Sequence, residues 1–408
     1  MFRDMRIYLD HAGATPINKE VLKEIHFYEK KFFANPSAIY KSGVYTRNLI
    51  EESRNKIAKL INAHPNEIIF TGSGTESDAL AVIGVIKNFR ENNKNVIPHI
   101  VTTTIEHPAI IENCKMLERE GIAEITYVKV NEKGIVNPKD IKESIKENTI
   151  LVSVMYANNE IGTIQPIQEI AKEIRYIRKI RQAEQNNFSL FFHTDACQAM
   201  NYLYTENIEK LGVDLMTFNS SKIYGPKGVG ILYKKREVNI SNVYGGGGQE
   251  FGLRSGTENT PYIIGAAKAL EITCNIKDKE SLRLSKIRDY TIAKLINLAK
   301  ETGYEIKLNG DSVNRLPNNI NISIIGISSE LLVVELDVKG IMVSEKSACH
   351  SSDSNKSYVI SAIRKTCRKD KKEEGSIRIS LGRGNNKKDM DILISSLRQI
   401  LNKYKKFN

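Results

Sequence analysis

The stretch LMTFNSSKIYGPKGVGILY, residues 215–233, joins two apolar runs through a polar segment and a turn rich in glycine and proline. Apolar runs of this length, rich in branched and aromatic residues, predict buried β-strands. Lys222 stands at the exit of the first strand, where partial desolvation lowers the pKa of an amine and frees it for Schiff-base chemistry. An isolated lysine is usually a surface residue, so Lys222 alone does not define a function.

Short apolar runs alternate with amphipathic helical patterns on both sides of this stretch, from about residue 66 onward. The alternation predicts βαβ units and a mostly parallel sheet buried on both faces, which is an α/β fold class. After GGGGQEFGLRSGTEN (245–259), a long helical stretch is followed by a mixture of strands and helices. We therefore expect a large domain over residues 15–264 and a small α+β domain formed by residues 1–14 and 265–408.

Two further segments place polar residues where predicted strands end, which is the edge of such a sheet at which ligands bind. In FTGSGTESDA (70–79), Gly74 and Thr75 begin a helix whose backbone amides can bind an anion, although an ordinary strand–helix turn explains the pattern equally well. In HTDACQA (193–199), Asp195 follows an apolar run, where a carboxylate is costly unless it meets a cation or hydrogen-bond donors. A protonated pyridine nitrogen is one such partner, and a helix N-cap is the alternative role.

The lysine segment resembles the motif that carries the cofactor in cysteine desulfurases, which are fold-type I pyridoxal-phosphate enzymes related to class V aminotransferases. Further segments that resemble this family follow in its order along nearly the whole chain: IYLDHAGATP, NPSA, IIFTGSGTESDALA, TTTIEHPAI, NNEIGTIQPI, HTDACQA, GGGGQEFGLRSGTEN, SACHSS and IRISLGRG. This number of ordered motifs makes the resemblance specific. It implies the fold-type I architecture, with a mainly parallel sheet in the large domain and the cysteine segment in the smaller α+β domain.

The resemblance also implies roles around the cofactor ring. Lys222 would bind pyridoxal 5'-phosphate covalently, Asp195 would pair with the ring nitrogen, and Gln198 would donate to the phenolic oxygen. His107 would stack on the ring and transfer protons, because an imidazole can both accept and donate a proton near neutral pH. Asn159 would contact both the cofactor and the substrate.

Other residues would hold the charged groups of the cofactor and the substrate. Gly74 and Thr75 would hold the phosphate, and Thr257 would reach the phosphate in the other subunit of a homodimer. Arg378 would bind the substrate carboxylate through a bidentate pair. At two positions that commonly serve the phosphate, the family usually has serine and histidine, where this chain has Asn219 and Ser221. Because amide and hydroxyl groups also donate hydrogen bonds, we expect cofactor binding to survive.

Cys349 lies in VSEKSACHSSDSNKS (343–357), a run too polar to form buried core. The resemblance implies that its thiolate attacks the sulfur of L-cysteine and becomes a persulfide, with L-alanine as the other product. The persulfide would then pass to an acceptor protein, such as an iron–sulfur scaffold or a tRNA-thiolation protein. The alternatives are a selenocysteine lyase or class V aminotransferase in which Cys349 has no role, and a non-catalytic scaffold or RNA-binding protein.

The composition of the chain bears on metal binding, nucleic-acid binding and location. The five scattered cysteines form no CxxC pair, which predicts neither a disulfide framework nor a metal site. The formal net charge of +12 comes from lysines spread along the chain, so we expect no direct nucleic-acid binding. The sequence has no signal-peptide pattern and no apolar run of about 20 residues, which predicts a cytoplasmic protein without a membrane partner.

Overall fold

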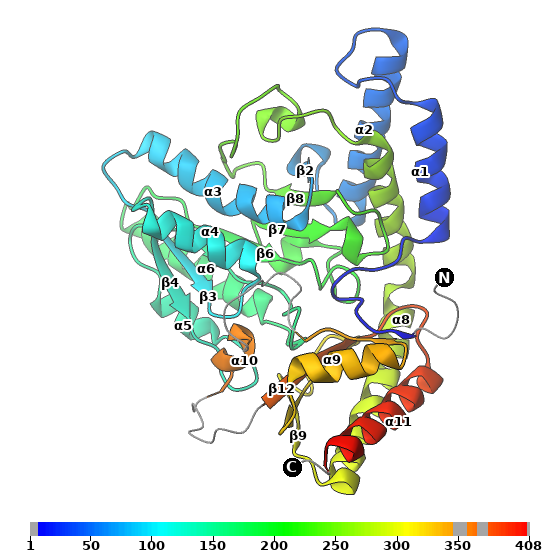
Figure 1. Ribbon diagram of the computed structural model, residues 1–408. Helices are drawn as coiled ribbons and strands as arrows, with labels where there is room; N and C mark the ends of the chain where they lie inside the picture. The colour runs from blue at the N-terminus through cyan, green and yellow to red at the C-terminus, as the bar shows by residue number, and fades with distance from the viewer. Residues whose placement is uncertain (1–6, 346–356, 365–373, 406–408) are drawn as a thin grey trace.

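A computed structural model describes residues 7–345, 357–364 and 374–405 of the chain. Its centre is a seven-stranded sheet with the strand order β2-β8-β7-β6-β5-β3-β4 (Figure 1). The strands of this sheet are β2 (Ile68–Thr71), β3 (His99–Thr103), β4 (Glu124–Val128), β5 (Thr149–Ser153), β6 (Phe191–Asp195), β7 (Leu215–Asn219) and β8 (Gly230–Lys234).

Strand β8 is antiparallel to both of its neighbours, and every other pair in this sheet is parallel. The prediction of an α/β fold with a mostly parallel sheet is therefore confirmed. Because β2, β3, β5, β6 and β7 run in the same direction, their carboxyl ends meet at one edge of the sheet. The ends of these five strands and the segments after them carry most of the predicted site residues; Thr257, Arg378 and Cys349 are the exceptions.

Helices cover both faces of the large sheet, as the continuous apolar runs of its strands require. On one face, Leu151 and Leu232 pack with apolar side chains of α3 (Gly74–Asn92) and α4 (Pro108–Arg119). On the opposite face, Val152 and Ile231 belong to the cluster that includes apolar side chains of α2 (Lys41–Leu60), α6 (Ile167–Ala183) and α8 (Thr260–Thr302). The remaining elements of this part are α1 (Lys19–Lys31), α5 (Pro138–Glu143), α7 (Ile208–Leu211), η1 (Pro65–Glu67), η2 (Ser220–Lys222) and η3 (Glu250–Gly252).

A smaller part of the chain is built on two further sheets. One is antiparallel, with the order β12-β10-β9, and the other is the parallel pair β1-β11. Helices α9 and α11 pack against this part, and α10 follows β11 in the chain (Figure 1). The elements are β1 (Ile7–Tyr8), β9 (Ile306–Leu308), β10 (Asn319–Ile325), α9 (Ser329–Val338), β11 (Ile341–Met342), α10 (Tyr358–Ala362), β12 (Glu374–Ser380) and α11 (Lys387–Tyr404).

Helix α8 has 43 residues and contacts elements of both parts, including α1 and α2 on one side and α11 on the other. The long helical stretch that the sequence predicts is one continuous helix. The predicted boundary between residues 264 and 265 falls inside α8, and the division into two domains stays a prediction. Within the described ranges, no helix combines the length and the apolar composition needed to cross a bilayer.

Candidate active site

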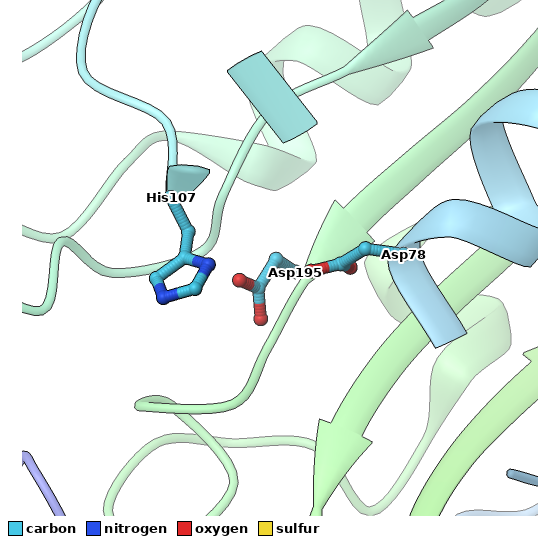
Figure 2. Close-up of side chains that lie close together, drawn as sticks. All are labelled: Asp78, His107 and Asp195. Carbon is cyan, nitrogen blue, oxygen red and sulfur yellow. The ribbon is translucent and has the colours of Figure 1, made fainter. Parts of the chain in front are cut away.

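Asp195 and His107 come together at the carboxyl edge of the large sheet, together with Asp78 from α3. Asp195 is the last residue of β6, and His107 is the N-cap of α4, just after β3. The ligand-type atoms of the three side chains all lie within 4.8 Å of one another, and Asp195 lies between the other two (Figure 2). Asp195 also accepts a hydrogen bond from the backbone N–H of Cys197 at 2.9 Å, which fixes the carboxylate.

The three side chains of this trio have the spacing of metal ligands. Asp78 is fully buried, and this burial, followed by the nearby charge of Asp195, raises its pKa well above the ordinary value. An imidazole and a carboxylate at this edge could also hold a flat heteroaromatic ring, with the carboxylate of Asp195 pairing with a protonated ring nitrogen.

Lys222 lies in η2, directly after β7, and its side chain points to the segment that follows β1. The Nζ atom donates to the carbonyl oxygen of Ala12 at 2.9 Å and to that of Gly13. Gln198 donates to the same Ala12 carbonyl at 3.0 Å, so both predicted residues meet at one acceptor. Burial lowers the pKa of Lys222, and the positive charge of Arg378 lowers it further. The amine is therefore more nucleophilic than that of an exposed lysine.

The predicted phosphate turn lies between β2 and α3. Ser73 caps α3, and the exposed Thr75 is in the first helical turn. A Cβ atom at Gly74 would lie 3.0 Å from Cys197 Sγ and 3.4 Å from Asn219 Nδ2, so a glycine is needed for this close approach. The backbone amides at the start of α3 supply an anion site of the kind that the sequence predicts.

Asn219 and Ser221, the two departures from the family pattern, are linked to each other. Asn219 Oδ1 accepts from the backbone N–H of Ser221 at 3.1 Å and from its hydroxyl at 3.2 Å, and so caps η2. The Asn219 Nδ2 atom is the one beside Gly74. An N–H donor therefore lies next to the helix start, and the capped η2 helix carries Lys222.

The loop that contains Thr257 packs close to the phosphate turn. Arg254, three residues earlier, donates from Nε to Glu76 Oε1 at 2.8 Å, and Glu76 Oε2 accepts from the backbone N–H of Gly72 at 2.6 Å. Thr257 itself is exposed. Glu76 thus ties the glycine-rich segment before Thr257 to the start of α3.

Arg378 reaches the site from the smaller part of the chain. It lies on β12 and is only 2% exposed. Its Nη1 atom donates to the backbone carbonyl of Asn159, after β5, at 3.1 Å. Its Nη2 atom forms an ion pair with Asp10 Oδ1 at 2.7 Å. The structure therefore brings Arg378 and Asn159 together, and it adds Asp10, a residue to which the sequence analysis gave no role.

Two more buried titratable residues were not predicted. Glu106 precedes His107, accepts from the backbone N–H of Met155 at 2.9 Å, and has its pKa raised by burial to about 8. His193, on β6, has its pKa lowered by burial to about 4 and hydrogen-bonds to the hydroxyl of Ser153 at 2.9 Å. Glu106 follows an apolar strand as Asp195 does, which was the available signal. His193 gave no comparable signal because it lies within a strand.

Cys349, in contrast, falls within residues 346–356, outside the described part of the chain. The described residues after that segment are attached to the site. Ser357 donates to Glu160 Oε2 at 2.5 Å, and the hydroxyl of Tyr358 donates to the backbone carbonyl of Glu106. Val359, Ile360 and Ile363 pack in a cluster with apolar residues of the loops after β3 and β5.

Comparison with known proteins gives a consistent set of relatives. Residues 7–393 match the family described as aminotransferase class V. A protein named cysteine desulfurase IscS from Dictyoglomus turgidum is 42% identical over 397 residues, covering 97% of this chain and 95% of the relative. One of the same name from Methanosarcina thermophila is 38% identical, covering 97% and 92%. A solved structure titled NifS-like protein superimposes with a TM-score of 0.85 at 32% identity, covering 98% of this chain and 100% of that one.

Proposed function

The chain belongs to the aminotransferase class V family, and from this premise we propose that it is a pyridoxal-phosphate-dependent cysteine desulfurase. The enzyme would convert L-cysteine to L-alanine and place the sulfur on Cys349 as a persulfide. One observation carries the proposal: a half-buried lysine of lowered pKa, Lys222, lies at the same edge of the sheet as the neighbouring side chains of Asp195 and His107. This is the donor set that pyridoxal phosphate requires.

The residues at this edge fit the cofactor group by group. Lys222 offers an amine that reacts with an aldehyde, and Asp195 offers a carboxylate for the ring nitrogen. The amides at the start of α3, with Gly74, Thr75, Asn219 and Ser221, would hold the phosphate. Gln198 would donate to the phenolic oxygen, and His107 would stack on the ring. When bound, pyridoxal phosphate supplies an electron sink for the negative charge that develops at the substrate Cα.

The chain's own residues would then orient the substrate and move its protons. Arg378 would bind the carboxylate of L-cysteine, with Asn159 beside it. Lys222 would transfer a proton at the substrate Cα, and His107 is suited to a second proton transfer. The thiolate of Cys349 would attack the substrate sulfur, so that an S–S bond forms while the Cβ–S bond breaks. The electron pair of the broken bond stays with the three-carbon fragment, which takes up a proton and leaves as L-alanine.

The decisive experiment follows the sulfur. We expect the holoenzyme, incubated with L-cysteine, to gain one sulfur atom on the Cys349 peptide, measured by mass spectrometry, and to release an equal amount of L-alanine. The Cys349→Ser variant should bind the cofactor but lose persulfide formation. If that variant produces alanine and sulfide at the wild-type rate, the enzyme is an aminotransferase-like or selenocysteine-lyase-like member and the desulfurase proposal is wrong.

Cys197 provides the matched control, because it is the thiol that the structure places at the site. Its Sγ atom lies next to Gly74, and burial raises its pKa well above the ordinary value. A thiol that stays protonated is a weak nucleophile. We therefore expect Cys197→Ser to keep persulfide formation on Cys349, whereas added sulfur on Cys197 in the wild-type protein would contradict the assignment.

The proposal includes a homodimer in which Thr257 reaches the phosphate site of the partner subunit. Two features support it. Thr257 is exposed although its loop is tied to the phosphate turn through Arg254. Large apolar side chains are also exposed on α1 and on the loop before α2, including Phe33 at 87% and Ile39 at 95%. Sedimentation at micromolar concentration should give twice the monomer mass, and a monomer that keeps full activity would contradict this part.

The proposed acceptor of the persulfide is another protein, either an iron–sulfur scaffold or a tRNA-thiolation protein. Direct nucleic-acid binding is not part of the proposal, and a cytoplasmic location stays a prediction from the sequence. Transfer of labelled sulfur from Cys349 to a purified candidate acceptor would identify the partner.

A further inference from the structure

The guanidinium group of Arg378 already has a carboxylate partner within the chain. Asp10 Oδ1 lies 2.7 Å from Nη2, the Asn159 carbonyl lies 3.1 Å from Nη1, and the buried Nε atom has no hydrogen-bond partner among the described residues. The side chain of Asp10 is 24% exposed and that of Arg378 is 2% exposed. A guanidinium this deeply buried needs a counter-ion, because an unpaired buried charge is strongly destabilising.

Asp10 is also close to Lys222, so it lies within the proposed substrate site. The charges of Asp10 and Arg378 both act on the Lys222 amine, Asp10 raising its pKa and Arg378 lowering it. The turn after Asp10 is closed by hydrogen bonds from the backbone N–H groups of Gly13 and Ala14 to the Asp10 carbonyl. The carbonyl of Gly13 in turn accepts from Lys222.

Gly13 makes the position of the Asp10 carboxylate possible. A Cβ atom at Gly13 would lie 2.5 Å from Asp10 Oδ2, closer than real Cβ atoms approach, and 3.2 Å from Oδ1, which is a tight contact. The carboxylate is therefore held against a residue without a side chain, on one side of the guanidinium. An alanine at this position would push the carboxylate away from Arg378 while keeping its charge.

We propose that Asp10 is the resident counter-ion of Arg378, and that the carboxylate of the amino-acid substrate replaces it on the guanidinium. This inference rests on the proposed function, which makes Arg378 the binding residue for the carboxylate of L-cysteine. Substrate binding is then an exchange of one carboxylate for another, and no unpaired buried cation arises at any stage. Asp10 sets the affinity for the carboxylate, and a ligand that has only an amine cannot make the exchange.

The test uses the holoenzyme and L-alanine, the expected product, as a ligand that does not turn over. Asp10→Asn removes the carboxylate that competes with the ligand for Arg378. We therefore expect the dissociation constant of L-alanine to fall about tenfold, the size of one hydrogen bond to a charged group. The KM for L-cysteine should fall in the same way. Cysteamine, which lacks the carboxylate, should bind no more tightly to the variant than to the wild type. An unchanged or raised dissociation constant for L-alanine would show that Asp10 only positions Arg378, and would overturn the proposal.

Three further variants distinguish a failure of this proposal from a failure of the proposed role of Arg378. Arg378→Gln should weaken L-alanine binding strongly; if it does not, the proposed role of Arg378 fails, independently of Asp10. If Asp10→Asn does not fold, Gly13→Ala decides the question, because displacing the carboxylate should also tighten L-alanine binding. Asp289→Asn, which removes the exposed partner of Arg288 on α8, is the matched control and should leave L-alanine binding unchanged.

Discussion

The Nζ atom of Lys222 lies 2.9 Å from the backbone carbonyl oxygen of Ala12, a residue 210 positions earlier in the chain. Lys222 lies in η2, which directly follows strand β7 of the large sheet, and the acceptor belongs to the segment that follows β1. The carbonyl oxygens of Ala12 and Gly13 fix the amine, and no carboxylate of residues 7–345, 357–364 or 374–405 forms an ion pair with it. Burial therefore dominates the pKa of Lys222 and lowers it.

The first prediction concerns the pH at which the apoprotein takes up its cofactor. Only a neutral amine attacks an aldehyde, so the rate of covalent reaction with pyridoxal phosphate should rise with pH. Because the pKa of Lys222 is lowered, the midpoint should lie below the value of about 10.4 for a lysine in a model peptide. Absorbance after rapid mixing measures the rate, with Lys222→Ala as the control that forms no covalent product. A midpoint at or above that of a free lysine would contradict the burial argument.

Glu106 gives a prediction for stability. Its pKa is about 8 in the folded protein and close to 4.5 in the unfolded chain. Between these values the folded state binds the extra proton, so the free energy of unfolding should fall as pH rises, by about 1.4 kcal/mol per pH unit at most. Glu106→Gln should remove this dependence, so the stability of the variant relative to the wild type should be higher at pH 8 than at pH 5. Urea unfolding at the two pH values measures it.

The matched control for this prediction is Glu112→Gln, which changes a carboxylate that is more than half exposed on α4. That variant should keep the pH dependence of the wild type. If the free energies of unfolding of the wild type and of Glu106→Gln change with pH in the same way, Glu106 does not hold the proton.

Asn219 gives a prediction for cofactor affinity. Its side chain caps η2, the short helix that carries Lys222, so Asn219→Ala should loosen that helix and weaken cofactor binding roughly fivefold, the effect of losing a helix cap. Asn219→Ser restores a capping hydroxyl and should keep near wild-type affinity. Titration of each apoprotein with pyridoxal phosphate compares the two, and equal weakening in both variants would show that the cap is not the cause.

Ser357 gives a prediction for the attachment of α10. Ser357→Ala should lower the free energy of unfolding by about 1–3 kcal/mol, because it removes a donor from the buried carboxylate of Glu160. The control, Ser361→Ala, removes an exposed hydroxyl that donates to the carbonyl of Ser357 and should change stability by less than about 0.5 kcal/mol. Equal effects of the two changes in urea unfolding would exclude a special role for the Glu160 contact.

The sequence predicts the large sheet and the strand exits well, because apolar runs and polar residues alternate there with a clear period. Lys222 and Asp195 could be placed at one edge for that reason, whereas the place of His107 came from the family resemblance. The pair of Asp10 and Arg378 could not be predicted, since the two residues are 368 positions apart and neither segment indicates the other. The same holds for Asp78, which the helical pattern of α3 presents as an ordinary helix residue, whereas packing buries it beside Asp195.

The continuity of α8 restricts how the active site can open. At about 1.5 Å per residue, its 43 residues form a rod of roughly 65 Å that contacts α1 and α2 at one end and α11 at the other. A hinge between the two parts that bear Lys222 and Arg378 would have to bend this rod, which costs hydrogen bonds along the helix. We therefore expect the distance between the Lys222 amine and the Arg378 guanidinium to stay nearly constant during turnover. The spacing between the amino and carboxylate groups of an acceptable substrate is then set by the fold and not by a closing movement.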